Sequence, residues 1–168
     1  MATIVVVGAT GVTGRRLVAG LGDAGHEVLP ARADATERAE TVRAADLVVA
    51  AARDPAVRGG WLEAAIREGV HALDAGADPT VALRAFDELG APARAARVTV
   101  VPAAGAAVGD LLAATALGAV RSPEEVHVCW AFPDRGGWRR ALAPGFRATA
   151  ADRLAGPLPV LRDGRREH

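Results

Sequence analysis

Apolar and polar residues follow one another along the chain in blocks that predict strands and helices in turn. Short continuous apolar runs, rich in Val, Leu and Ala, predict buried strands over residues 3–7, 27–32, 46–52, 70–74 and 98–101. Apolar residues at helical spacing predict helices over residues 11–24, 35–45, 56–68, 79–96 and 109–120, with a break allowed at Gly90–Pro92. A period of two then predicts a sixth strand over residues 125–132.

This succession of strand and helix predicts an α/β fold of the doubly wound, Rossmann-like kind. Continuous apolar strands indicate a parallel sheet that is covered by helices on both faces, and right-handed crossovers make it doubly wound. Gly25 and Gly69 are placed to end the helices that precede them. Pro30 lies inside the second strand and cannot donate to a ladder, so that strand is expected at an edge.

The first predicted strand runs directly into a glycine-rich turn, Gly8-x-x-Gly11-x-x-Gly14, and the first predicted helix follows. In such a turn backbone N–H groups can approach a pyrophosphate, and the helix N-terminus favours its negative charge. The spacing differs from the commoner GxGxxG, but its position between a strand and a helix favours dinucleotide binding. The alternative is a turn whose glycines serve only the packing of strand against helix.

Composition limits the classes of function. The formal net charge is zero, so the chain shows no electrostatic footprint for nucleic acid or an acidic membrane. No apolar run reaches the ~18 residues of a membrane span, and the apolar start is too short and uncharged for a signal peptide, so we expect a cytoplasmic protein. The chain has no Lys and no Tyr, which excludes a lysine Schiff base and a Tyr/Lys proton-transfer pair within it.

The remaining polar residues form no recognisable catalytic or metal-binding group, and no catalytic residue is assigned. Asp74 is the best single candidate, because it ends a strand at the edge where α/β sites open. His71 is three residues away on the same strand and is expected to point to the opposite face. His127 and Cys129 could be two metal ligands, but no second pair completes a tetrahedral site, so no metal is expected.

Residues 6–15, Val-Val-Gly-Ala-Thr-Gly-Val-Thr-Gly-Arg, resemble the NADP-binding start of the saccharopine dehydrogenase-like oxidoreductases, which include the trans-acting enoyl reductases. Residues 61–78 resemble a helix and the following strand of that family. Residues 97–113 and 145–164 resemble its Val-Thr-x-Val-Pro-Gly-x-Gly segment and its Gly-Thr-Arg-x-Thr and Asp-Gly-Arg stretch. The resemblance implies an NAD(P)-binding domain over residues 1–122. It also implies a strand and tail over residues 123–168, the remnant of a substrate and dimerisation region.

The resemblance further implies which residues contact the cofactor. They lie in the glycine turn and at the ends of the second and third strands: Gly8, Thr10, Gly11, Val12, Thr13, Gly14, Arg32, Ala51 and Ala52. Arg32 could pair with the 2′-phosphate of NADP, whereas Asp34 could accept from the ribose 2′-hydroxyl of NAD. Arg32 is nearer to the strand end, which favours NADP over NAD.

The chain departs from this family in its length and in one crossover. Family members usually carry an extra helix and strand between the second strand and the strand at 46–52. Here only residues 33–45 intervene, enough for one crossover of about 10–12 residues, which predicts the strand order 2-1-3-4-5. The missing unit helps to wall the adenine pocket in the family. Family chains also usually continue well past the position of residue 168.

Two functions are consistent with these features. The first is an NAD(P)-dependent oxidoreductase that transfers hydride to or from a small substrate, with a homodimer or a partner protein supplying the missing substrate region. The second is a degenerate Rossmann-fold protein with a non-redox binding or biosynthetic accessory role. The intact glycines favour the first function, and the shortened crossover favours the second.

Overall fold

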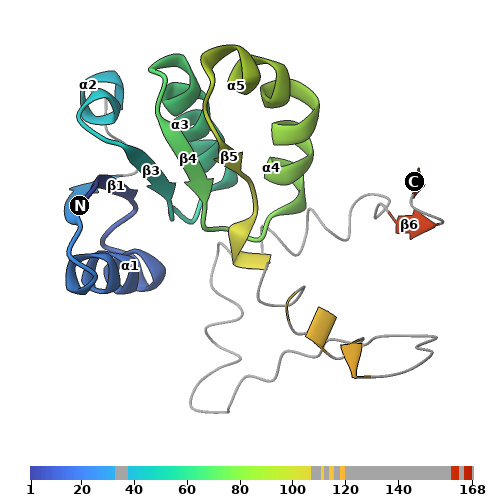
Figure 1. The fold of residues 1–168 in the computed structure, drawn as a ribbon, viewed down its shortest axis with the longest axis horizontal. Coiled ribbons are helices and arrows are strands. Elements are labelled where there is room, and N and C mark those ends of the chain that lie inside the picture. The colour runs from blue at the N-terminus through green and yellow to red at the C-terminus, as the bar shows by residue number, and fades with distance from the viewer. Residues whose placement is uncertain are drawn as a thin grey trace. The chain divides into compact units, whose positions relative to one another are not determined.

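The computed structural model describes the greater part of the predicted dinucleotide-binding region and two short strands near the C-terminus (Figure 1). The described residues are 1–32, 38–106, 111, 114–115, 118–119, 160–162 and 165–167. The chain divides into two compact units, Met1–Val128 and Cys129–His168. The predicted strand over 125–132 and most of the predicted helix over 109–120 lie outside the described residues, as do His127 and Cys129.

The first unit contains a five-stranded parallel sheet with the order β2-β1-β3-β4-β5, as predicted. Its strands are β1 (Thr3–Val7), β2 (Glu27–Ala31), β3 (Leu47–Ala50), β4 (His71–Asp74) and β5 (Val100–Val101). The prediction of an edge position for β2 is confirmed, and Pro30 is the residue of β2 that lies opposite Val6. A Rossmann-like α/β fold is therefore present.

Helices connect the strands and cover both faces of the sheet. They are α1 (Val12–Asp23), α2 (Arg38–Arg43), α3 (Pro55–Arg67), α4 (Pro79–Arg84), a π-helical turn η1 (Ala85–Leu89), α5 (Gly90–Ala96) and a 3₁₀ turn η2 (Ala104–Ala106). Gly25 and Gly69 follow α1 and α3 with φ of 83° and 72°, so they end these helices as predicted.

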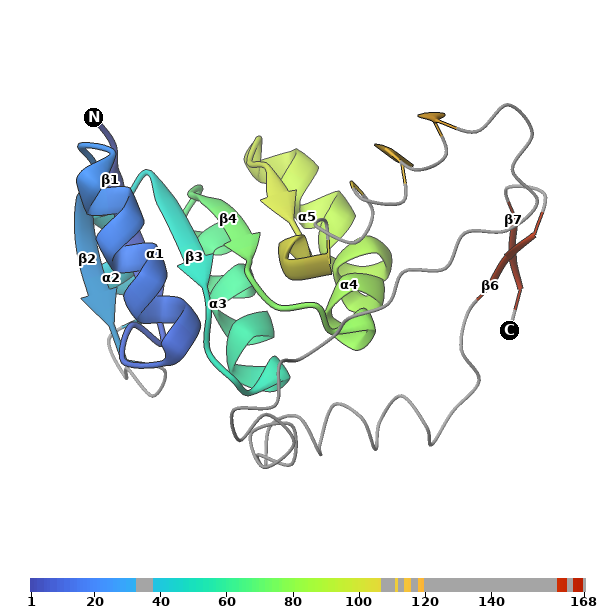
Figure 2. The same ribbon diagram turned by 90° about the horizontal axis from the view of Figure 1, so that it is seen from below.

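The alternating side chains of β1 point into two separate apolar cores. Ile4 and Val6 pack under α1, whereas Val5 and Val7 pack under the helices of the opposite face, including α3. Figure 2 shows α1 on one face of the sheet and α3 on the other. Because successive side chains of a strand point to opposite faces, both layers of helices depend on the same five residues.

The helical segment over 79–96 is uninterrupted along the sequence but changes its hydrogen-bonding pattern. The sequence allowed a break at Gly90–Pro92, and the irregular turn is η1, immediately before it. Pro92 has no N–H to donate to the carbonyl of Glu88, and its ring crowds that carbonyl in a regular α-helix. A wider turn before Pro92 is a way to accommodate both effects.

Trp61 anchors the packing of α2 and α3 on the sheet. Its side chain is fully buried, and the guanidinium carbon of Arg38 lies 5.7 Å from the centre of its ring.

We expect Trp61→Ala to lower the free energy of unfolding by roughly 3–5 kcal/mol, because it leaves a large cavity and removes a cation–π contact. Phe86 is 70% exposed and provides the control. Urea denaturation of Phe86→Ala should show a change within about 0.5 kcal/mol, and an equal loss in both variants would contradict this account.

The second unit contains a hairpin that the sequence analysis did not predict. Strands β6 (Val160–Arg162) and β7 (Arg165–Glu167) pair antiparallel, with Arg162 opposite Arg165. The residues between them in the sequence are Asp163 and Gly164. Asp-Gly between two short extended runs is a strong local signal for a hairpin, so the sequence contained the information. The predicted boundary at residue 122 stays a prediction.

Candidate functional site

The glycine turn after β1 folds back on itself and brings the loop after β3 into contact. Gly8 has φ of 77°, a conformation that glycine adopts without strain. Its N–H donates to Ala31 O at 3.0 Å, and its carbonyl accepts from Gly11 N at 3.0 Å. A Cβ on Gly8 would lie 2.8 Å from Ala52 Cα, so only glycine lets these two loops meet.

Gly14 has a different role from the other two glycines. It is buried in the first turn of α1, and a Cβ there would lie 2.2 Å from Gly8 O and 2.7 Å from Ala9 Cα. Gly14 therefore seats the helix on the turn instead of facing a ligand. For this glycine the structure supports the packing role that was the alternative to ligand binding.

Gly11 leaves the N-terminus of α1 open. It is the N-cap residue with an ordinary extended conformation, φ −71° and ψ 169°. None of the described side chains caps the helix, and its first turn contains no acidic residue. By contrast, Asp54 and Asp78 cap α3 and α4 by accepting hydrogen bonds from the N–H groups of Ala56 and Thr80. The N–H groups and positive dipole end of α1 therefore remain available to an anion.

This open helix end faces a cleft of about 560 Å³ at the edge of the sheet where the strands end. The cleft is lined by Gly8, Thr10, Gly11, Val12, Thr13, Ala51, Ala52, Arg53, Ala75 and Gly76. The structure thus brings together most of the residues predicted to contact a cofactor. Gly14 and Arg32 are the exceptions, since neither lines the cleft.

Arg32 directly follows the edge strand β2 and is exposed. Asp34, its competitor for the ribose, lies outside the described residues. The expected preference for NADP over NAD therefore stays a prediction, and so does the role of Arg32 in it.

Three residues of the cleft were missed by the sequence analysis: Arg53, Ala75 and Gly76. Arg53 follows Ala52 directly, and the other two follow β4. Carboxyl ends of neighbouring parallel strands meet at one edge of a sheet, so the order 2-1-3-4-5 already places the ends of β3 and β4 beside the glycine turn. Extending the predicted site by one residue after Ala52 and by the loop after β4 would have found them.

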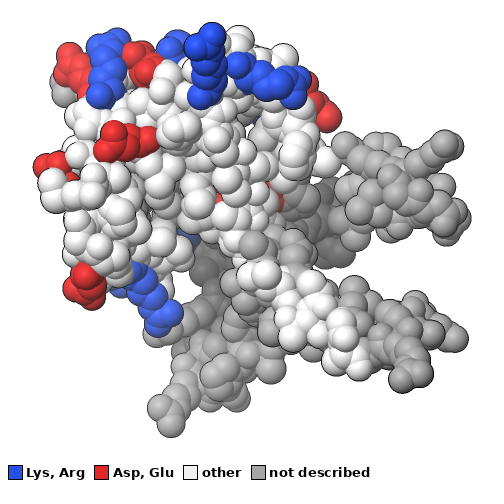
Figure 3. Space-filling view, in the orientation of Figure 1, with Lys and Arg blue, Asp and Glu red and all other residues white. Residues whose placement is uncertain are grey.

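Charge does not mark this cleft. In Figure 3 most of the visible charged side chains gather along the upper edge, where Figure 1 shows α2, the beginning of β4 and α5. Among the residues that line the cleft, Arg53 is the one with a charged side chain. An anion bound here would therefore be held mainly by backbone N–H groups, with Arg53 as its cationic neighbour among the described residues.

A buried ion pair lies beneath the cleft. Asp74 is fully buried, Arg58 is 5% exposed, and Arg58 Nε lies 2.7 Å from Asp74 Oδ1. The Nε–H group is not directed at the carboxylate closely enough for a hydrogen bond, so the contact is an ion pair. The Asp74 carboxylate accepts from Gly76 N at 2.9 Å, and Arg58 Nη1 donates to the carbonyls of Ala52 and Arg53 at 3.0 Å each.

These contacts correct the interpretation of Asp74 as the best catalytic candidate. Its carboxylate is fully buried and does not line the cleft, and it binds the loops around it instead. His71 lies on the other face of β4, as predicted: it is exposed, and its Nδ1 accepts from Thr99 N at 3.0 Å. In the described part of the chain no three His, Cys, Asp or Glu side chains gather as a metal site would require.

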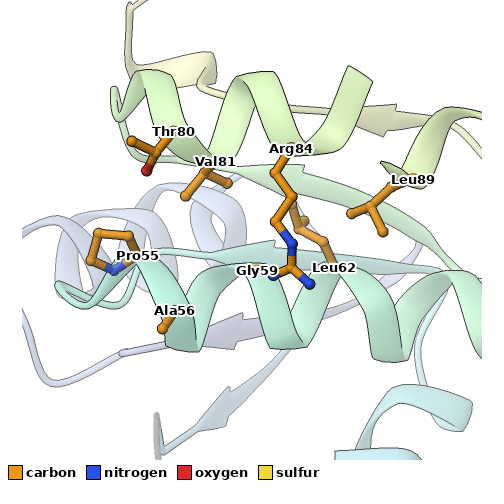
Figure 4. Close-up of a pocket in the computed structure, with 8 residues that line it drawn as sticks. All are labelled: Pro55, Ala56, Gly59, Leu62, Thr80, Val81, Arg84 and Leu89. Atoms are coloured by element: carbon orange, nitrogen blue, oxygen red, sulfur yellow. The ribbon is translucent and has the colours of Figure 1, made fainter. Parts of the chain in front are cut away.

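A second, smaller groove of about 270 Å³ lies between α3 and α4 (Figure 4). Arg84 reaches across it from α4 toward Gly59 and Leu62 of α3. The Arg84 guanidinium forms ion pairs with Glu88 at 2.8 Å and with Glu63. The hydrogen bond to Glu88, together with the charge of Glu63, raises the pKa of Arg84 above its ordinary value. Because Glu63 and Glu88 already neutralise the charge of Arg84, this groove is less suited to bind an anion than the cleft is.

No helix within the described part of the chain has the length and hydrophobicity needed to cross a membrane. No protein-family model matches the chain, and a search among curated proteins finds no match.

Several solved structures are similar to part of the chain. A crystal structure of CapF with the inhibitor 3-isopropenyl-tropolone is 22% identical with a TM-score of 0.48, over 60% of this chain and 30% of that protein. The capsular polysaccharide assembling protein CapF from Staphylococcus aureus is 20% identical with a TM-score of 0.47, over 59% and 34%. A short-chain dehydrogenase/reductase superfamily protein from Agrobacterium tumefaciens with bound NAD is 20% identical with a TM-score of 0.39, over 45% and 32%.

The matched region spans about a third of each of these proteins. At such identities and TM-scores the likeness concerns the arrangement of strands and helices, and it carries no ligand or activity to this chain.

Proposed function

We propose that this protein binds a nicotinamide dinucleotide in the cleft between the glycine turn and the loops after β3 and β4. The observation that carries the proposal is the open N-terminus of α1, which has neither a capping side chain nor an acidic residue and faces a 560 Å³ cleft. A pyrophosphate suits such a helix end, because backbone N–H groups and the helix dipole both favour negative charge. The exposed turn residues leave room for its approach.

We propose further that the protein is an NAD(P)-dependent oxidoreductase of the saccharopine dehydrogenase-like type, acting on a small substrate. A bound nicotinamide would supply or accept the hydride. The residues of this chain would bind and orient it: the glycine turn and the α1 N-terminus would hold the pyrophosphate, and the loops after β3 and β4 would border the remaining space. The substrate surface would be completed by the C-terminal region, a second copy of the chain or a partner protein.

A second candidate is a dinucleotide-binding protein without redox activity, serving a binding or biosynthetic accessory role. The lining of the cleft favours it, because the described residues offer no acid, histidine or cysteine there and Asp74 is sealed in an ion pair. Thr10 and Thr13 are the residues with hydroxyl side chains among the described residues that line the cleft. Proton transfer during turnover would then fall to water or to the substrate.

Calorimetric titration of the full chain with NADPH and with NADH tests the shared part of both candidates. Binding of NADPH in the micromolar range supports the cleft assignment, and absence of binding by both nucleotides would refute it. Oxidation of NADPH in the presence of carbonyl, imine or enoyl substrates then separates an oxidoreductase from a binding protein. A substrate-dependent loss of absorbance at the nicotinamide band is expected for the first candidate only.

Arg32 tests the choice between the two nucleotides. We expect Arg32→Ala to weaken NADPH binding by roughly ten- to hundredfold, the value of one charge-assisted hydrogen bond to the 2′-phosphate, and to leave NADH binding unchanged. Arg16 on α1 is exposed and provides a matched Arg→Ala control. Equal losses for both nucleotides would show that Arg32 does not read the 2′-phosphate.

A further inference from the structure

The buried ion pair beneath the cleft joins three loops that are far apart in the sequence. Arg58 belongs to α3, yet it binds the carbonyls of the loop after β3. Asp74 ends β4 and accepts from Gly76 N in the loop after β4. The other carboxylate oxygen of Asp74 lies 3.4 Å from Ala103 N in the loop after β5. The pair is therefore placed to hold the floor of the cleft together.

The Arg58 side chain is tightly packed against the loop after β4. A Cβ on Gly76 would lie 2.6 Å from the guanidinium carbon of Arg58, so the peptide backbone lies directly against the charged group. Ala103 has φ of 51°, a left-handed conformation that costs a non-glycine residue energy. Such a residue persists only where its surroundings fix it, and Asp74 is one of the groups that do so.

The two hydrogen bonds that Arg58 donates to the carbonyls of Ala52 and Arg53 also set the direction of the peptide groups in the loop after β3. In a trans peptide the carbonyl and the N–H point in opposite directions. Because the carbonyls of Ala52 and Arg53 turn inward to Arg58, the N–H groups of Arg53 and Asp54 turn away from the buried cation. Ala51, Ala52 and Arg53 line the cleft, so a ligand bound there would meet this loop.

We propose that the buried Arg58–Asp74 ion pair is a positioning device for the cleft. By holding the carbonyls of Ala52 and Arg53 inward, it presents N–H donors and the Arg53 side chain to an anionic or oxygen-bearing group of the ligand, opposite the α1 N-terminus. This inference rests on the proposed function and goes beyond it, because it assigns binding strength to two residues that do not touch the ligand.

Replacing the pair by apolar side chains of similar volume separates positioning from stability. In Arg58→Met/Asp74→Leu no charge is left buried alone, and such replacements often preserve the stability of a protein. We expect this double variant to keep a cooperative thermal transition and to bind NADPH roughly tenfold or more weakly than the wild type. Amide hydrogen exchange at Ala52–Asp54 and Gly76 should become faster, while exchange in α1 should not change.

The matched control is a second Arg–acid pair that is remote from the cleft. Arg43 and Glu68 form an ion pair at 2.6 Å on the surface, where Arg43 is 60% exposed. Arg43→Met/Glu68→Leu should leave both NADPH affinity and amide exchange in these loops as in the wild type.

Arg58→Lys covers the case in which the first double variant does not fold. It keeps the charge opposite Asp74 but cannot reach both carbonyls as a guanidinium does, so its NADPH affinity should also fall.

The outcomes distinguish the inference from the proposed function. If the wild type binds NADPH and either folded variant binds it equally well with unchanged exchange, the ion pair is not a positioning device. If the wild type binds neither NADPH nor NADH, the proposed function fails. Exchange at Ala52–Asp54 and Gly76 then decides the orienting role alone: faster exchange in the variants supports it, and unchanged exchange overturns it.

Discussion

Gly14→Ala should destabilise the protein more than a Gly→Ala substitution at any other glycine of α1. Its Cβ would lie 2.2 Å from Gly8 O and 2.7 Å from Ala9 Cα, and both are backbone atoms that cannot rotate away. The helix must shift from the turn, at a cost of about 3 kcal/mol in the free energy of unfolding, the upper end for overpacking. For a chain of this size the melting temperature should fall by roughly 10 °C.

Gly20 provides the control within the same helix. It is exposed, and a Cβ there would meet no atom within 4 Å. Gly20→Ala should therefore stabilise the protein by roughly 0.5–1 kcal/mol, since alanine restricts the unfolded chain and favours a helix. Calorimetry or thermal denaturation followed by circular dichroism compares the two. Opposite signs are expected, and a harmless Gly14→Ala would show that α1 does not sit on the turn as described.

The sequence predicted the sheet well because its signals were local. Each strand of the sheet is a short apolar run, and Gly25 and Gly69 end their helices through a backbone conformation that glycine favours. The position of β2 at an edge followed from the missing N–H of Pro30 and from a connection too short for a second crossover. These constraints act within a few residues, so they can be recognised from the sequence alone.

The site was only partly predictable, because its floor is made by contacts between distant residues. The glycine turn and the loop after β3 were found, since they flank a recognisable motif. Arg58 was not, because an arginine in a helical pattern looks like any solvated side chain until the fold places Asp74 beside it. Asp74 was interpreted as a catalytic candidate because it ends a strand at the edge where α/β sites open. Its burial depends on neighbouring strands and loops, which the sequence pattern does not show.

Gly11→Asp should abolish the binding of NADPH and leave the protein as stable as before. Gly11 has a conformation open to any residue, and an added Cβ would meet Gly8 O at 3.3 Å, a close contact that needs only a small shift of the turn. Aspartate is a preferred N-cap, so the change should alter the free energy of unfolding by only a few tenths of a kcal/mol. Its carboxylate, however, would take the N–H groups of α1 and repel a pyrophosphate. Losing two charge-assisted hydrogen bonds of about 1.5–3 kcal/mol each weakens binding by at least roughly a hundredfold.

Gly11→Asn separates charge from shape in this test. Asparagine has nearly the same volume and caps helices equally well, but it carries no charge to repel phosphate. We expect its NADPH affinity to lie between those of the wild type and Gly11→Asp, with melting temperatures alike in all three. Equal losses in both variants would mean that side-chain bulk alone closes the cleft. Wild-type affinity in Gly11→Asp would place the pyrophosphate elsewhere, and the open end of α1 would then have no part in recognition.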